Sequence, residues 1–220
     1  MNSHGANIFE IAKNNGIEIK DIKDFSSNIN PLGPSVKALN SLKNNLVLLS
    51  SYPDVEYIDL KNSISNYASC DEKNIVLGLG STEILKDAIK FFNPKISMIL
   101  SPCYSEYENE LKKINSKIIE YNLEEKNNFE INLDEIINLI NKNKVELFVF
   151  ANPNNPTGTI LSALDIEKIL TETDAKILVD ETYVEFTDMD IFSSAKLTKH
   201  YKNLAIVRGT SKFFALPGIR

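Results

Sequence analysis

The chain has 220 residues, of which 43% are hydrophobic and 25% are charged, and its formal net charge is −6. These values suit a folded globular protein and exclude a mainly disordered chain. The sequence pI of about 5.1 offers no basic field of the kind that nucleic-acid binding needs. We therefore expect no nucleic-acid partner.

The two cysteines, Cys70 and Cys103, make no disulfide framework for a chain of this length, and no Cys/His spacing suits zinc. The first residues lack the basic-then-apolar layout of a signal peptide. The apolar runs are much shorter than the roughly 20 residues that a membrane helix needs. These features predict a cytoplasmic protein with no membrane segment and no metal site.

The first third of the chain predicts short helices around an irregular segment. Amphipathic helices are expected over 6–14 and 35–43, and a further helix over 56–68. Between the first two, Pro31 and its neighbours Gly33 and Pro34 keep the segment 24–34 out of a helix.

From residue 75 onward, short apolar runs alternate with stretches of helical periodicity. The runs that predict strands are 75–79, 96–100, 117–121, 145–151, 176–179 and 204–207, and the predicted helices are 81–92, 104–114, 133–140 and 163–170. This alternation predicts an α/β fold, a three-layer sandwich with a mostly parallel central sheet. Because ligands of such sheets bind beyond the carboxyl ends of the strands, the residues that follow each apolar run are the candidate site.

Gly80, Ser81 and Thr82 follow the run 75–79 and open a predicted helix. A Ser81 or Thr82 hydroxyl can cap that helix, and its free N–H groups can hold a phosphate. The glycine fingerprints of dinucleotide and P-loop sites are both absent. Taken alone, the segment is better explained as an ordinary capped helix.

Three further segments follow predicted strands. Tyr104 can lie flat on a planar ligand or simply pack. The loop 152–158, which contains Asn155, is either a polar site or a plain turn. Asp180, with Tyr183 three residues later, is a carboxylate at the buried end of a strand and needs a partner, which a helix cap or a salt bridge would also supply.

The last segment carries a lysine in unusual surroundings. Lys212 stands between Ser211 and two phenylalanines, and a desolvated lysine has a lowered pKa and becomes a nucleophile. The chain's two arginines, Arg208 and Arg220, both lie in its last thirteen residues. Since arginine suits fixed anion contacts, this end of the chain is chemically distinct.

Taken together, Asn154-Asn155-Pro156-Thr157-Gly158, Asp180-Glu181-Thr182-Tyr183 and Ser211-Lys212 with Arg220 resemble the fold-type I (class I/II) aminotransferase family, over essentially the whole chain. The resemblance implies the cofactor pyridoxal 5′-phosphate. It implies that Lys212 forms the Schiff base and then transfers protons, and that Asp180 pairs with the pyridine nitrogen. Tyr183 and Asn155 would bond the ring's phenolic oxygen, and Tyr104 would stack on the ring.

The same resemblance assigns the cofactor's phosphate to residues from three segments, namely Gly80, Ser81, Thr82, Ser211 and Arg220. The family usually has Ser or Thr three residues before the lysine, where this chain has Gly209, so one phosphate contact is in question. A homodimer with the active site at the interface is also implied. In that arrangement Tyr52 reaches the cofactor phosphate of the neighbouring subunit.

The resemblance further implies a domain division. Residues 1–45 would form an N-terminal arm and part of the small domain, and 46–220 a large cofactor-binding domain that is incomplete at its C-terminal end. The C-terminal small domain, with an arginine that grips the substrate carboxylate, would be missing. Residues 1–220 alone are therefore expected to show little or no turnover.

Within the family, two subgroups fit best. The segments around His4-Gly5, Asn28 and Lys212–Gly218 resemble the threonine-phosphate decarboxylases of cobalamin biosynthesis, which implies substrate contacts by His4, Gly5, Asn28 and Asn155. The implied reaction converts L-threonine O-3-phosphate to (R)-1-amino-2-propanol phosphate. Histidinol-phosphate aminotransferase or another class I/II aminotransferase, an inactive fragment that only binds the cofactor, and a nucleotide-binding α/β protein remain alternatives.

Overall fold

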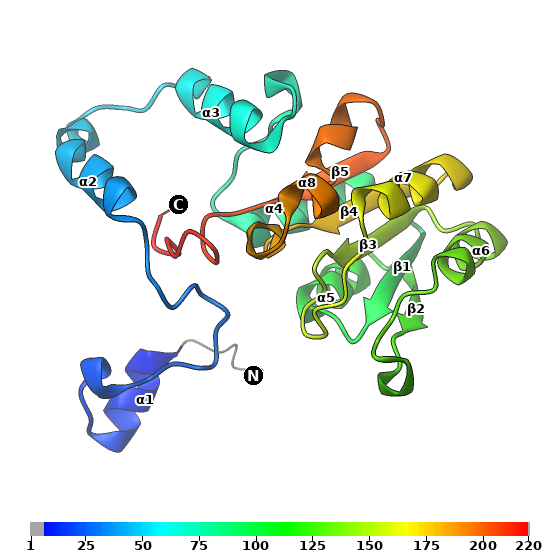
Figure 1. The fold of residues 1–220 in the computed structure, drawn as a ribbon, viewed down its shortest axis with the longest axis horizontal. Helices are drawn as coiled ribbons and strands as arrows, with labels where there is room; N and C mark the ends of the chain where they lie inside the picture. The colour runs from blue at the N-terminus through cyan, green and yellow to red at the C-terminus, as the bar shows by residue number, and fades with distance from the viewer. Residues whose placement is uncertain (1–6, 220) are drawn as a thin grey trace.

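The computed structural model describes residues 7–219 and is built on one five-stranded sheet (Figure 1). The strands, in the spatial order β2-β1-β3-β4-β5, are all parallel to their neighbours. Their bounds are β1 Ile96–Ser101, β2 Lys117–Asn122, β3 Leu147–Ala151, β4 Lys176–Asp180 and β5 Leu204–Val207. The predicted parallel α/β sheet is confirmed.

Two pairs of helices cover the two faces of this sheet. They are α4 Ser81–Phe92 and α5 Ser105–Lys113 on one face, and α6 Leu133–Asn143 and α7 Ala163–Glu172 on the other. In β3 the side chains alternate as the strand pleat requires: Phe148 and Phe150 pack in the cluster with α6 and α7, and Val149 packs in the cluster with α4 and α5. The strands β1, β3 and β4 are buried on both faces, which explains why they read as continuous apolar runs.

The first third of the chain adds little to this core. None of α1 Ile8–Asn15, α2 Val36–Asn44 and α3 Ile58–Ala68 has a buried residue. Figure 1 shows α1 and α2 lying apart from the sheet. The remaining helices are short: α8 Met189–Phe192 and the 3₁₀ turns Ile19–Asp21, Leu46–Ser50, Glu72–Asn74, Glu125–Asn127, Val184–Phe186 and Ala195–Lys199.

The segment 75–79 is not a strand, and that prediction is wrong. In the described part of the chain, no strand pairs with it. The side chains of Val76 and Leu79 are 78% and 64% exposed, so its apolar residues are not buried as those of the true strands are. A run of apolar residues becomes a strand only when a neighbour takes up its backbone hydrogen bonds.

Across residues 7–219, no helix combines the length and apolarity needed to cross a membrane. Over the same residues, no group of three or more His, Cys, Asp or Glu side chains is placed to hold a metal ion.

Candidate active site

The carboxyl ends of the three neighbouring strands β3, β4 and β5 bring the predicted motifs together. Asp180, the last residue of β4, is in register with Ala151 of β3 and Val207 of β5. The backbone continues these pairings past the strand ends, because the Glu181 N–H donates to the Val207 carbonyl at 2.8 Å. Three segments therefore leave the sheet side by side. They are the asparagine loop (152–158), the Asp180–Tyr183 motif and the lysine segment (208–219).

Asp180 is held by neutral donors. Its side chain is almost fully buried, at 7% exposure. The Tyr107 hydroxyl donates to Oδ2 at 2.9 Å, and Thr182 donates to Oδ1 through its hydroxyl at 2.5 Å and its N–H at 3.0 Å. Burial raises the pKa of Asp180, and these hydrogen bonds oppose that rise. The carboxylate is thus fixed in place while its negative charge is not neutralised by these partners.

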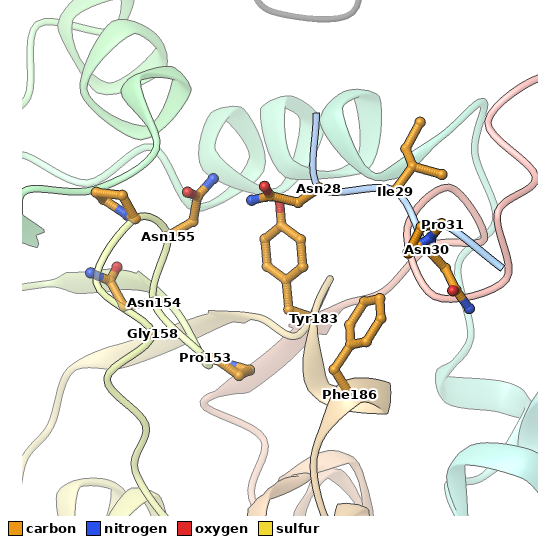
Figure 2. Close-up of a pocket in the computed structure, with 11 residues that line it drawn as sticks. Asn28, Ile29, Asn30, Pro31, Pro153, Asn154, Asn155, Gly158, Tyr183 and Phe186 are labelled. Atoms are coloured by element: carbon orange, nitrogen blue, oxygen red, sulfur yellow. The ribbon is translucent and has the colours of Figure 1, made fainter. Parts of the chain in front are cut away.

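Tyr183 meets a residue from the far end of the chain. The Asn28 side-chain amide donates to the Tyr183 hydroxyl at 3.4 Å. Burial raises the pKa of Tyr183, and the bond from Asn28 opposes the rise. Figure 2 shows Asn28 over the tip of the Tyr183 ring, with Asn155 close by.

These side chains line a cavity of about 400 Å³, here named the asparagine pocket. Its lining residues are Asn28, Ile29, Asn30, Pro31, Pro153, Asn154, Asn155, Pro156, Gly158, Tyr183 and Phe186. The pocket joins the N-terminal irregular segment to the loop after β3. The structure therefore brings together Asn28, Asn155 and Tyr183, which were predicted from three distant parts of the sequence.

Lys212 lies in a segment without helix or strand, and it is half-buried. Burial lowers the pKa of its amine, as its apolar neighbours predict. Asn30 fixes the backbone here, because its N–H donates to the Lys212 carbonyl and its side chain to the Phe213 carbonyl, both at 3.0 Å. The lysine segment is thus tied to the same N-terminal segment as the asparagine pocket.

The N-terminus of α4 differs from the prediction in one respect. The cap residue is Gly80, with φ of 96°, and no side chain caps the helix, so the predicted cap by Ser81 or Thr82 is wrong. A positive φ favours glycine, which explains why the cap falls one residue earlier. The first N–H groups of α4 are left without a side-chain acceptor, as an anion site requires.

The lysine segment passes directly over this helix end. A Cβ atom placed on Gly209 would lie 3.4 Å from Ser81 Cβ and 3.5 Å from its Oγ. The α4 N-terminus and the residues before Lys212 therefore face one another. Ser211, next to Lys212, is half-buried.

Tyr104 follows the end of β1 and is half-buried at the same edge of the sheet. Its ring meets that of Tyr107 edge-on at 5.6 Å, and Tyr107 in turn holds Asp180. Tyr52, by contrast, lies apart with a fully exposed side chain. His4, Gly5 and Arg220 fall outside the described residues.

Two sets of residues were missed from the sequence. Tyr107 stands three residues after Tyr104, a spacing that places both on one helix face, and this signal could have found it. Arg208 was singled out, but its partners were not: its guanidinium bridges Glu181 and Glu185, which lie on either side of Tyr183.

The sequence of this chain was compared with families of known proteins, and one family matches most of it. The family model "Aminotransferase class I and II" matches residues 20–220. A protein of Caldanaerobacter subterraneus subsp. tengcongensis, provisionally assigned by its name as a threonine-phosphate decarboxylase, is 35% identical over 99% of this chain and 57% of its own length. A histidinol-phosphate aminotransferase of Methanococcoides burtonii is 36% identical over 98% of this chain and 59% of its own length.

A solved structure from the same family has a similar fold. The histidinol-phosphate aminotransferase of Clostridium acetobutylicum superposes with a TM-score of 0.80 at 36% identity, covering 90% of this chain and 59% of that one. The chain thus spans 57 to 59% of the length of these relatives. The match to the family model and the shared fold lead to one conclusion: the chain belongs to the class I and II aminotransferase family, whose cofactor is pyridoxal 5′-phosphate.

Proposed function

We propose that this protein decarboxylates L-threonine O-3-phosphate to (R)-1-amino-2-propanol phosphate. The observation that carries the proposal is the contact of Asn28 with Tyr183, because it brings the N-terminal segment that resembles the decarboxylases into the pocket that also holds Asn155. The relative named as a threonine-phosphate decarboxylase supports the proposal, since it is 35% identical to this chain over 99% of the chain's length.

The residues at the sheet edge fit pyridoxal 5′-phosphate. The uncapped N-terminus of α4, overlain by Gly209, suits a phosphate. Asp180 is a buried carboxylate with neutral partners, which suits a cationic ring N–H. Lys212 is a half-buried amine with a lowered pKa, which suits an aldehyde.

When bound, the cofactor supplies an electrophilic aldehyde and an aromatic ring that accepts an electron pair. Lys212 provides a neutral amine for that aldehyde, because burial lowers its pKa. With the substrate in the site, Lys212 would, in its protonated form, donate a proton to the substrate Cα after carbon dioxide has left. Asp180, which Tyr107 and Thr182 hold in place, would keep a proton on the ring nitrogen.

The other proposed cofactor contacts surround these two residues. Tyr183 and Asn155 hold the ring's phenolic oxygen, and Tyr104 covers a ring face. The phosphate is assigned to Gly80, Ser81, Thr82, Ser211 and Arg220. For the substrate, Asn28 and Asn155 are the proposed contacts in the asparagine pocket, together with His4 and Gly5.

A second candidate is transamination, as in histidinol-phosphate aminotransferase. The relative from Methanococcoides burtonii and the solved structure from Clostridium acetobutylicum, both 36% identical, favour it. The two reactions share the same electron sink and differ in which bond to Cα stands perpendicular to the ring. A third candidate is a fragment that binds the cofactor without turnover.

We also propose a homodimer in which Tyr52 reaches the phosphate of the neighbouring subunit. The full exposure of its side chain leaves it free to do so. The division into an arm with part of a small domain (1–45) and a large domain (46–220) stays a prediction, as does the cytoplasmic location.

Cofactor binding is tested first. The purified protein is titrated with pyridoxal 5′-phosphate, and the visible absorbance band of a lysine-bound cofactor is followed. Lys212→Ala is expected to lose the band, while Lys202→Ala, which alters an exposed lysine, is expected to keep it. Absence of the band in the unaltered protein would contradict a covalent role for Lys212.

The reaction is tested next. Protein loaded with the cofactor is given O-phosphothreonine and no keto acid, and carbon dioxide is measured. Repeated turnover supports decarboxylation. Reaction of glutamate with imidazole acetol phosphate in its place would favour the aminotransferase, and binding of the cofactor with neither reaction would favour the fragment.

A further inference from the structure

Arg208 is the first residue after β5, and it lies beside Glu181, the first residue after the neighbouring strand β4. It directly follows Val207, which pairs with Asp180, and the Glu181 N–H donates to the Val207 carbonyl at 2.8 Å. The Arg208 Nη2 atom lies 3.1 Å from Glu185 Oε1, and its Nε lies 3.6 Å from Glu181 Oε2. One guanidinium therefore spans two carboxylates that sit four residues apart. We name these three residues the arginine clamp.

The clamp is buried. The Arg208 side chain is 17% exposed, and those of Glu181 and Glu185 are 0% and 3% exposed. The Tyr67 ring of α3 faces the guanidinium at 5.6 Å, and Met189 Sδ of α8 lies 3.1 Å from Nη2. These two contacts add to the burial of the guanidinium.

Glu181 is fixed from a second side. Its carboxylate accepts from the Ser193 hydroxyl at 2.9 Å and from the Ser194 N–H at 2.6 Å. By contrast, Glu185 Oε2 and Arg208 Nε have no hydrogen-bond partner in the described structure. Burial raises the pKa of Glu181 to about 7 and raises that of Glu185, although Arg208 opposes both shifts.

Stability alone does not account for such a cluster. Burying three charges carries a desolvation penalty that their attraction often fails to offset, and well-packed apolar residues are often as stable. What the three charged groups provide is a link between two segments, because one guanidinium lies within ion-pair distance of both carboxylates even though its Nε donates no hydrogen bond.

That geometry joins the two reactive segments. Glu181 and Glu185 lie two residues before and two residues after Tyr183, and Arg208 lies four residues before Lys212. The lysine segment itself has no helix or strand, so its own backbone does little to fix its course. Asn30 holds it at Lys212, and the clamp holds it where it leaves the sheet.

We propose that Arg208 is a positioning residue, which through Glu181 and Glu185 sets the placement of Lys212 relative to Tyr183. The inference rests on the proposed function of Lys212 as the cofactor-binding amine. It predicts that a variant without the clamp still folds, but that the surroundings of the Lys212 amine change.

The test compares Arg208→Lys, which keeps the charge and loses the planar guanidinium, with the triple variant Glu181→Gln/Glu185→Gln/Arg208→Met, which leaves no charged group in the clamp. Lys168→Met is the control, because it breaks an exposed ion pair with Asp134. The first readout needs no cofactor: the pH profile of Lys212 acylation, followed by peptide mass spectrometry. The second is the affinity for pyridoxal 5′-phosphate, and the unfolding temperature monitors the fold.

In both clamp variants we expect the Lys212 profile to move to higher pH and the cofactor affinity to fall about tenfold or more. The triple variant is expected to unfold within a few degrees of the unaltered protein. An unchanged Lys212 profile in a folded clamp variant would overturn the proposal, and so would failure of every clamp variant to fold. The proposed function fails differently, by loss of the cofactor band in the unaltered protein.

Discussion

Tyr107 and Asp180 form a buried polar contact at the sheet edge. The tyrosine side chain is fully buried, and its hydroxyl lies 2.9 Å from Asp180 Oδ2. Burial raises the pKa of Asp180, so its ionised form already reduces the stability of the folded state at neutral pH. The hydroxyl of Tyr107 offsets part of that penalty.

Replacing Tyr107 with Phe should therefore destabilise the protein in a pH-dependent way. Removing a bond to a buried carboxylate costs about 1–3 kcal/mol when the carboxylate is ionised. The pKa of Asp180 would rise further, so the loss is full at pH values above the folded pKa. It shrinks as the pH falls and Asp180 becomes protonated in both states. Urea unfolding at neutral and acidic pH measures the difference.

Tyr121→Phe is the matched control. The Tyr121 hydroxyl also donates to a carboxylate, that of Glu135 at 3.1 Å, and accepts from the Asn132 N–H at 3.3 Å, but Tyr121 lies on the edge strand β2 and both contacts are only partly buried. Its loss should be smaller and depend less on pH. Equal losses from both tyrosines at all pH values would show that Asp180 is not sensitive to its partner.

At the scale of elements, the helix α4 was predicted with its bounds correct, whereas the run before it was not. Periodicity finds α4 because its apolar residues, such as Leu85 and Ile89, repeat on one buried face. The run 75–79 has the composition of a strand, but a strand also needs a paired neighbour, and local sequence does not report pairing.

The candidate site shows the same limit. Residue types at strand ends indicated Asp180, Tyr183 and Lys212, because chemistry and position are both visible in the sequence. The contact of Asn28 with Tyr183 links residues 155 positions apart, and no local pattern reports it. The resemblance implied a substrate contact by Asn28, but its hydrogen bond to Tyr183 is visible only in the fold.

The approach of Gly209 to α4 yields a prediction about this element. A Cβ atom here would lie 3.4 Å from Ser81 Cβ, an ordinary contact distance, so a small side chain fits. Gly209→Ser places a hydroxyl at the uncapped helix end, where it can donate to a bound phosphate. We expect pyridoxal 5′-phosphate to bind about five- to tenfold more tightly, as one added bond to a charged group allows.

Gly209→Ala separates the hydroxyl from the added bulk. It should leave the affinity within about twofold, because its methyl group fits the same space without a donor. Spectral titration of the two variants against the unaltered protein gives the comparison. If serine and alanine have the same effect, the phosphate does not lie over this helix end.

At the scale of the whole molecule, the sheet buries its apolar residues and the segment that precedes it does not. Leu48, Leu49 and Tyr52 are 61%, 84% and 101% exposed, and Val47 and Val55 are exposed beside them. Exposed apolar residues grouped in this way mark an interaction surface more often than free solvent surface. The proposed homodimer would cover them.

We predict that Leu48→Glu/Leu49→Glu moves the protein from dimer to monomer in sedimentation velocity experiments, because two buried charges oppose association. Leu164→Glu is the control, since Leu164 is also exposed, at 76%, but lies on α7 away from this segment. Tyr52→Phe should leave the dimer intact and weaken only cofactor binding, because it removes one hydroxyl. A monomeric unaltered protein, or a double variant that remains dimeric, would contradict the assignment of this surface. A dimer whose cofactor affinity ignores Tyr52 would keep the interface but remove its role in the neighbouring site.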